Sequence, residues 1–280
     1  MRRGLLGIAF AVVCVAAVSA DVTITTGITI EGAMAAAAGG APTPKVVTRI
    51  KGDKARTDIE VSGMNTTTIV DLTTKQMMLL RHDDKTAQLI EPGSATVPTP
   101  KGPMPMPKID TTVKPTGQKR DINGVSCAEY SIMMIMDMSS MGGRADMPPE
   151  AAAMFKGLTM KMSGSAWVAR DAPGAPEYAT YQAAAAKMAL GAIAGGAGAA
   201  GRGGMGTMPQ GMEKLIAGFA EAPGIPYLTE LTMSMEGNAK IAAMMAQMGQ
   251  MKIISKVTDV STAAVDDSLF VVPADYKTIK

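Results

Sequence analysis

Methionine is the most abundant chemically distinctive residue in this chain, with 26 of 280 residues. Thioether sulfur is a soft ligand that selects Cu(I), and the flexible side chain repacks around irregular apolar partners. Five methionines fall within SIMMIMDMSSMGG, residues 131–143. These residues permit three interpretations: a soft-metal site, the lining of an apolar cavity, or packing of an ordinary core.

Strand periodicity divides these methionines between two faces. In residues 126–138, the even positions are almost all apolar, whereas the odd positions mix apolar and polar residues. Because alternate side chains of a strand point to opposite faces, Met133 is expected to face away from the apolar side, and Met141 falls in the glycine-rich turn that follows. Two other alternating segments carry paired methionines. The candidate lining of a hydrophobic cavity is Tyr130, Met134, Met136, Met138, Met160, Met162, Met233 and Met235.

Copper binding is the alternative use of methionine. The strand methionines sit among Ile and Ala, without a cluster of His or Cys. The segments MPMP and GGMGTMPQGM lack strand periodicity and are expected to be more accessible to a metal. The candidate copper ligands are therefore Met104, Met106, Met205 and Met208.

The residues that could support enzyme chemistry are few. His82 is the single histidine, and it precedes Asp83 and Asp84 in a predicted hairpin turn, which favours a solvated turn. A nucleophile needs a positioned base, and nothing in the sequence brings Cys127 to His82. The GxGxxG match at 196–201 follows an alanine-rich helix instead of a strand, which is the wrong context for a dinucleotide. We therefore expect a protein that is not an enzyme and has no cofactor.

The first 20 residues resemble a signal peptide. Arg2 and Arg3 precede an apolar stretch too short to span a bilayer comfortably, and Val18-Ser19-Ala20 provides small residues for cleavage. Cleavage after Ala20 predicts a periplasmic or otherwise exported product. An uncleaved anchor, or a lipoprotein modified at Cys14, are the alternatives.

Removal of the leader changes the charge and the cysteine content. Taking its two arginines from 27 Lys+Arg leaves 25, against 25 Asp+Glu. This balance argues against nucleic acid as a partner, since nucleic-acid binding needs a clustered basic surface. No later stretch has the length and apolarity of a transmembrane helix. Cys127 becomes the single cysteine, which favours a buried apolar role.

Residues 21–280 are expected to form one domain dominated by an antiparallel sheet. Alternating segments predict strands at 21–31, 45–51, 54–61, 75–81, 85–90, 126–138, 158–168, 227–235 and 251–260. Helices are expected at 147–157, 175–190, 208–221 and 238–248. Flexible insertions rich in Gly, Ala or Pro are expected near 33–44, 92–108 and 191–207. A single sheet with one solvated face can bury its other face by curling around helices.

Several landmarks along the chain carry a family resemblance. In order they are KVVTRIKGDKARTDIE, DLTTKQMMLLRHDDK, INGVSCAEYSI, SAWVARD, GIPYLTELT and VDDSLFVVPADYK. This order resembles a family of exported bacterial proteins and, through it, the lipoprotein-carrier (LolA/LolB-like) half-barrel superfamily. The resemblance implies an α+β fold in which a curved antiparallel sheet holds helices on its concave face. It also implies a cavity for acyl chains, and it supplies no catalytic residues.

The functional expectation combines these observations. The leading hypothesis is a carrier or sensor that binds a lipid, an acyl chain or an acylated protein in a methionine-lined cavity. A Cu(I)-binding envelope protein is one alternative, and a structural or protein-interaction module of the envelope is another. The sequence leaves the ligand, the partner and the oligomeric state open.

Overall fold

The computed structural model describes residues 21–32, 43–61, 64–90, 108–139, 150, 153, 155–196, 218, 222–237 and 250–279. Within these residues the chain forms one open sheet of twelve strands. The strands are β1 (Val22–Glu31), β2 (Lys45–Lys51), β3 (Lys54–Val61), β4 (Met64–Asp71), β5 (Gln76–Arg81), β6 (Thr86–Ile90), β7 (Lys108–Ile122), β8 (Val125–Asp137), β9 (Thr159–Ala169), β10 (Ile225–Glu236), β11 (Met251–Ser261) and β12 (Lys277–Ile279).

The sheet order is β12-β6-β5-β4-β3-β2-β1-β11-β10-β9-β8-β7. Every pair is antiparallel except β12 with β6, so the predicted antiparallel sheet is confirmed. Strands β1 to β6 follow one another from the middle of the sheet toward the β12 edge. Strands β7 to β11 follow one another from the opposite edge back to the middle. The early strand β1 therefore pairs with the late strand β11 in the interior of the sheet.

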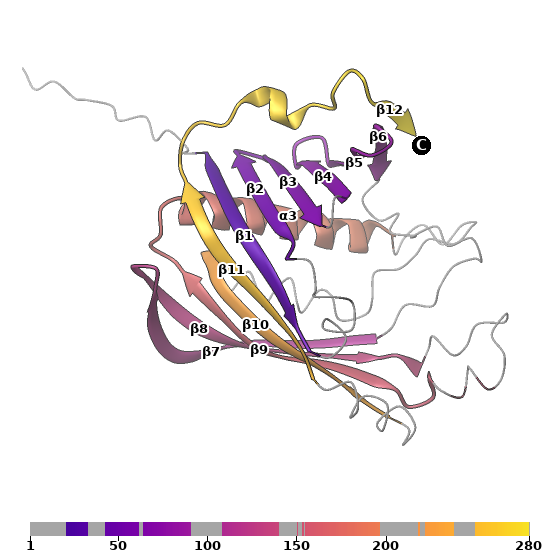
Figure 1. The fold of residues 1–280 in the computed structure, drawn as a ribbon, viewed down its shortest axis with the longest axis vertical. Coiled ribbons are helices and arrows are strands. Elements are labelled where there is room, and N and C mark those ends of the chain that lie inside the picture. The colour runs from indigo at the N-terminus through magenta and orange to yellow at the C-terminus, as the bar shows by residue number, and fades with distance from the viewer. Residues whose placement is uncertain are drawn as a thin grey trace, which may run out of the picture.

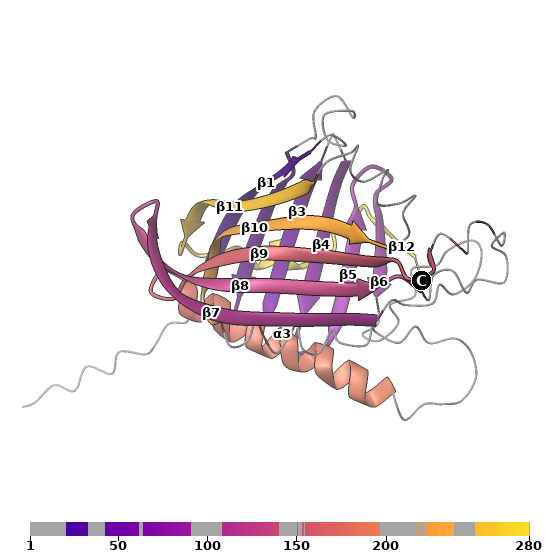
Figure 2. The same cartoon turned by 90° about the horizontal axis from the view of Figure 1, so that it is seen from below.

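The sheet bends near β1 and β11. Figure 1 shows that β2–β6 form one arm and β7–β10 form the other. Figure 2 shows that the strands of the second arm run across the direction of the first. Breaks in strand register accompany this bend, between Thr25 and Thr26 of β1 and between Pro226 and Leu228 of β10.

Short turns join the hairpins. Asn123 and Gly124 link β7 to β8 and have φ values of 55° and 79°. Positive φ at both central positions is the conformation of a type I′ turn, which Asn-Gly favours because its twist matches that of the strands. The expected hairpin between β2 and β3 turns at Gly52, which also has a positive φ of 55°.

Three strands differ from the expectation. The threonine-rich β4 and the polar β7 show little apolar alternation, although Thr and Val are good strand formers. The short β12 lies at an edge and has no sequence signal of its own. Strand β7 is also an edge, and its polar residues and Pro115 suit an edge because they discourage pairing with another chain.

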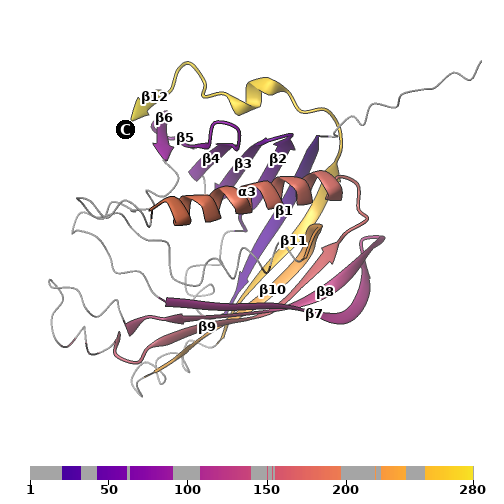
Figure 3. The same cartoon turned by 180° about the vertical axis from the view of Figure 1, so that it is seen from behind.

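Helix α3 (Ala175–Gly196) begins where the sequence predicted, but it is longer than expected. Its last residues fall inside the segment 191–207 that we expected to be flexible, and its alanine content explains the extension. The helix contacts β2 and β10, and Figure 3 shows it lying across the strands of the β1–β6 arm. Of the other expected helices, residues 150, 153, 155 and 218 are helical. The segment 238–248 and most of the three predicted insertions lie outside the described residues.

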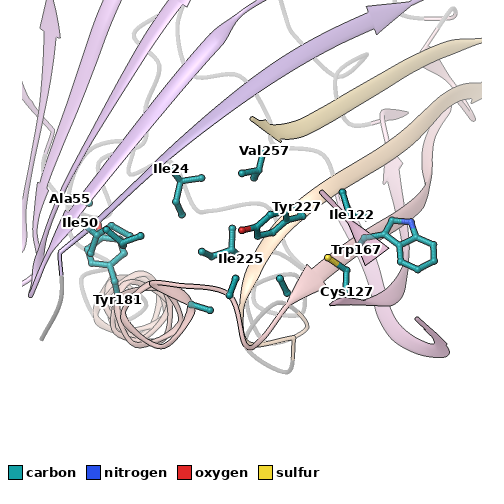
Figure 4. Packing of buried hydrophobic residues seen from close by; sticks show 14 residues of the cluster. Ile24, Ile50, Ala55, Ile122, Cys127, Trp167, Tyr181, Ile225, Tyr227 and Val257 are labelled. Atoms are coloured by element: carbon teal, nitrogen blue, oxygen red, sulfur yellow. The ribbon is translucent and has the colours of Figure 1, made fainter. Parts of the chain in front are cut away.

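A first core joins α3 to both arms. Tyr181 of α3 belongs to the same buried cluster as Ile50, Ala55 and Ile225, and Figure 4 shows Tyr181 beside Ile50 and Ala55. Burial raises the pKa of Tyr181 to about 12. The same cluster contains Cys127, which is fully buried as the sequence predicted. Burial also raises the pKa of the Cys127 thiol.

A second core contradicts the expectation of one solvated face. Leu80 and Ala87 are fully buried and pack against Val265 and Phe270 from the C-terminal segment. That segment includes the short 3₁₀ helix η2 (Asp267–Phe270) and runs past the strands of the first arm to β12 (Figure 1). The strand pattern of residues 75–90 could not reveal this cover, because its apolar residues come from the far end of the chain.

Candidate functional site: the methionine face

The strand register brings the predicted methionines together. Met134 pairs with Met162, Met162 pairs with Met233, and Met233 pairs with Met251, so one row of methionines crosses four strands. Directly paired residues of neighbouring strands lie on the same face of a sheet. A second row contains Met136, Met160 and Met235. We call the seven residues the methionine face: Met134, Met136, Met160, Met162, Met233, Met235 and Met251.

The methionine face is half-buried. All seven side chains have intermediate exposure, and paired Cβ atoms of neighbouring antiparallel strands are about 4.5–5.5 Å apart. Thioether side chains at this spacing make a continuous apolar band across β8–β11. Of this set, Met251 was not predicted from the sequence. Its alternating segment was recognisable, but its pairing with Met233 was not.

The opposite face of β8 is open. Met133 is 42% exposed and Ile135 is 37% exposed, and their partners on β9 are the polar residues Ser163 and Lys161. Met138 comes just after the end of β8, where its backbone N–H donates to the Leu158 carbonyl at 2.9 Å. The five methionines of residues 131–143 therefore do not form one cluster, and Met141 lies outside the described residues.

The apolar band continues toward the other end of β8. Tyr130 and Ile132 are buried and pack with Ala166, Val168 and Ala222. Gly218, which is helical, lies against this region, since a Cβ at Gly218 would be 2.9 Å from Val113 Cβ. Val113 pairs with Ile132 and so lies on the same face as the methionines. A helical residue therefore packs on this face.

An arginine marks the end of the band beyond Tyr130. Arg170 donates a hydrogen bond from Nη2 to Tyr130 Oη, and its guanidinium carbon is 5.9 Å from the centre of the Tyr130 ring. Tyr130 is only 3% exposed, whereas Arg170 is exposed. Sequence reasoning missed Arg170, although it continues the alternation of Ala166 and Val168.

A polar cluster occupies the opposite face of the first arm. The Asp58 carboxylate accepts hydrogen bonds from Arg49 Nη1 at 2.5 Å and from Arg56 Nε at 2.8 Å. Thr67 Oγ1 donates to the same carboxylate at 2.5 Å. Arg56 also donates from Nη1 to the Leu269 carbonyl at 2.9 Å, which fastens the C-terminal segment to the sheet. Thr67 is fully buried.

His82 belongs to this cluster, which corrects our prediction of a solvated histidine. Its Nε2 is 2.7 Å from Thr67 Oγ1, and its Nδ1 is hydrogen-bonded to Tyr276 Oη. The turn itself is correct, because His82 comes directly after β5. The side chain is half-buried because Tyr276 arrives from the C-terminal segment, 194 positions away in the sequence. The six residues Arg49, Arg56, Asp58, Thr67, His82 and Tyr276 are the polar cluster.

A cavity of about 390 Å³ adjoins the polar cluster. Its lining combines charged, polar and apolar residues: Lys45, Val47, Asp58, Ile59, Glu60, Asn65, Thr66, Thr67 and His82. The Thr67 hydroxyl is buried and already donates to Asp58, so it is not available as a nucleophile. No group of three or more His, Cys, Asp or Glu suited to a metal ion occurs among the described residues. The hydrogen bonds within the cluster indicate a structural role.

The remaining candidates do not assemble into a site. Cys127 is buried in the first core, whereas His82 bonds to Thr67 and Tyr276, so the two do not form a catalytic pair. The candidate copper ligands Met104, Met106, Met205 and Met208 lie outside the described residues, as does the predicted signal peptide.

Comparison with known proteins gave no assignment. Neither a scan of protein-family models nor a search of curated proteins found a match. In the part of the chain that the structure describes, no helix has the length and apolarity needed to cross a membrane.

Proposed function

We propose that this chain is an exported, non-enzymatic protein that binds an acyl chain, either of a lipid or of an acylated protein, along the methionine face. The observation that carries the proposal is the register of Met134, Met162, Met233 and Met251 across four strands, together with their half-buried state. Unbranched, polarizable side chains adapt to an apolar partner of variable shape. Such a face suits a carrier or sensor better than an enzyme.

The size of the apolar band agrees with an acyl chain. At about 3.4 Å per residue, the stretch of β8 from Tyr130 to Met136 is about 20 Å long. One leaflet of a bilayer's hydrocarbon core is about 15 Å thick, half of the full core. Burial of each CH₂ group contributes about 0.8 kcal/mol to binding, so partial coverage of the chain already supplies a substantial driving force.

Helical segments cover the methionine face in this proposal, as in the half-barrel carriers that the sequence resembles. Gly218 and Ala222 lie against the Ile132 end of the face. Helix α3 packs on Ile24 and Ile50 of the first arm. Ile30 shares a face with Ile24 through strand alternation, and it pairs with Ile253, which pairs with Leu231. The helices and the methionine face then share the concave side of the sheet, and movement of a helix would admit the ligand.

The proposed compartment rests on the sequence of the first 20 residues. Their positive start, apolar stretch and small residues before position 21 are the pattern of a cleaved export signal. An acyl-binding protein of the periplasm or another exported space would move or sense lipids, or acylated proteins, between membranes.

The test compares two neighbouring methionines that face opposite sides. Met134→Gln places an amide of similar length on the methionine face, whereas Met133→Gln places it on the exposed face. Burying an unpaired amide costs about 1–3 kcal/mol, so the Met134 variant should bind a fluorescent fatty acid about tenfold more weakly. The Met133 variant should match the wild type.

Native mass spectrometry after mild purification provides an independent measurement. A co-purified lipid mass is expected for the wild type. An unliganded mass, together with no uptake of fluorescent fatty acid, would refute the proposal. Equal weakening in the Met133 and Met134 variants would refute the assignment of the face.

Soft-metal binding is the second candidate, because the same row aligns four thioethers on neighbouring strands. Two or three of them could converge on one Cu(I) ion, which prefers sulfur ligands. Calorimetric titration with Cu(I) under reducing conditions tests this candidate. Binding weaker than micromolar would exclude it.

A further inference from the structure

We propose that Arg170 and Lys119 bind the anionic head group of the ligand, so that the ligand is an amphiphile with an acyl chain and a negatively charged head. This inference rests on the proposed function, because it assumes that the acyl chain lies along the methionine face. It adds the chemical class of the head group and the direction in which the ligand lies.

Both cations lie at one end of the methionine face. Arg170 follows Ala166 and Val168 in strand alternation, just beyond the end of β9. Lys119 pairs with Ala128, and Ala128 pairs with Val168. Lys119 therefore shares the face on which Val168 and the methionines lie. Lys119 and Arg170 are both exposed.

Arg170 and Lys119 differ in their partners from the other arginines that the structure describes. Arg49 and Arg56 bind Asp58, and Arg81 pairs with Asp84 at 3.7 Å. Arg120 stacks on the Trp167 ring, with its guanidinium carbon 4.3 Å from the ring centre.

Among the described residues, by contrast, neither Arg170 nor Lys119 forms an ion pair. The carboxylates closest in sequence, Asp121 and Asp171, are not their partners, and Asp121 instead accepts a hydrogen bond from the Gly124 N–H at 2.8 Å. An uncompensated guanidinium beside an apolar band suits an anionic oxygen of a ligand.

Tyr130 joins the charged end to the apolar end. Its hydroxyl oxygen accepts a hydrogen bond from Arg170, which leaves its proton free to donate to an anion. Arg170 can offer its planar fork of N–H donors to a carboxylate or a phosphate in a bidentate arrangement. Beyond Tyr130 the face is apolar through Ile132 to Met136. Along this face, Arg170 comes first, then Tyr130, then the apolar band. This order matches a ligand with an anionic head followed by an acyl chain.

The test uses two single-chain lipids with the same palmitoyl chain, below their micelle-forming concentrations. Lysophosphatidylglycerol has an anionic phosphate in its head, whereas monopalmitoylglycerol has an uncharged head without a phosphate. The wild-type protein should bind the anionic lipid about tenfold more tightly, the effect of one charge-assisted hydrogen bond. The preference should shrink as salt is raised, because the two cations are exposed.

Three variants distinguish this head-group site from a general effect of charge. Arg170→Gln should weaken binding of the anionic lipid and leave binding of the uncharged lipid unchanged. Arg170→Lys should keep part of the preference, since it retains the charge but loses the fork. Arg81→Gln removes the same charge from the other arm and should keep the full preference.

The outcomes separate this inference from the proposed function. Equal binding of the two lipids by the wild type, or equal loss of both lipids in Arg170→Gln, would overturn the head-group inference and leave acyl binding intact. Failure of the wild type to bind either lipid would overturn both. Denaturation curves matching the wild type would confirm that the variants are folded.

Discussion

Thr67 shows how one hydroxyl can organise several charged groups. It is fully buried, donates to Asp58 and lies within hydrogen-bond distance of His82 and of Arg56 Nη2 at 3.3 Å. Valine would fill the same space and would suit a strand. The threonine is therefore explained by its hydrogen bonds.

Replacement of Thr67 by valine should destabilise the fold. It removes one hydrogen bond to the Asp58 carboxylate and one to His82, and a hydrogen bond to a charged group contributes about 1.5–3 kcal/mol. The free energy of unfolding in urea measures the change. Thr57→Val is the matched control on the other face, where a half-buried hydroxyl is hydrogen-bonded to Thr48 at 3.3 Å. Similar losses in the two variants would mean that the polar cluster contributes little.

The orientation or burial of a side chain could be predicted from the sequence where its neighbours along the same strand determine its environment. Met133 and Met134 face opposite sides as their alternation indicates, and Cys127 is buried. Prediction failed for His82 and for Arg170, whose partners come from other strands or from the far end of the chain. A lone histidine beside two aspartates carries no signal for Tyr276, 194 positions later.

At the scale of elements, the C-terminal segment covers part of the second face of the first arm, over Ile69, Leu80 and Ala87. Besides the contacts of Phe270 and Val265, Lys51 donates to the Val265 carbonyl at 2.8 Å and pairs with Asp267 at 2.9 Å. Lys85 pairs with Asp275 at 2.8 Å. These ion pairs are partly or fully exposed, so the apolar contacts provide most of the stabilisation.

Leu80→Ala tests this cover. Leu80 is fully buried in the second core, and removal of such a side chain costs about 2–5 kcal/mol. Leu89→Ala on the same face is the control, because Leu89 is 37% exposed and should lose clearly less. Urea unfolding of the two variants measures the difference. A loss of less than about 1 kcal/mol at Leu80 would show that the segment is not firmly packed in solution.

Secondary-structure elements were also predictable only where residues nearby in the sequence determine their environment. Segments in which apolar and polar residues alternate along the sequence, such as β1 and β9, were predicted, although residues 166–169 of β9 are buried on both faces. Strand β4 alternates weakly because the C-terminal segment covers its second face, and β7 because it is a polar edge. Helix α3 was placed correctly at its start, but glycines near its end suggested too early a stop.

At the scale of the whole molecule, the sheet order places β1 and β11 in the middle and β7 and β12 at the two edges. Strands β1 and β11 have a partner on each side, whereas β7 and β12 have one. Interior strands open only in large unfolding events, and edges fray. Native-state hydrogen exchange should therefore be slowest in β1 and β11 and fastest in β7 and β12. Equal protection across these strands would contradict the observed order.

The pairing of β1 with β11 has a consequence for the order of folding. Thr258 of β11 donates to the carbonyl of Thr25 in β1, 233 positions earlier. If the chain is exported N-terminus first, β1 emerges early, and one of its edges has no partner until residues 251–261 follow. A long chain closure slows folding, and an unpaired strand edge is prone to associate with other chains. Export in that order would therefore require a chaperone that protects the free edge of β1 until β11 has emerged.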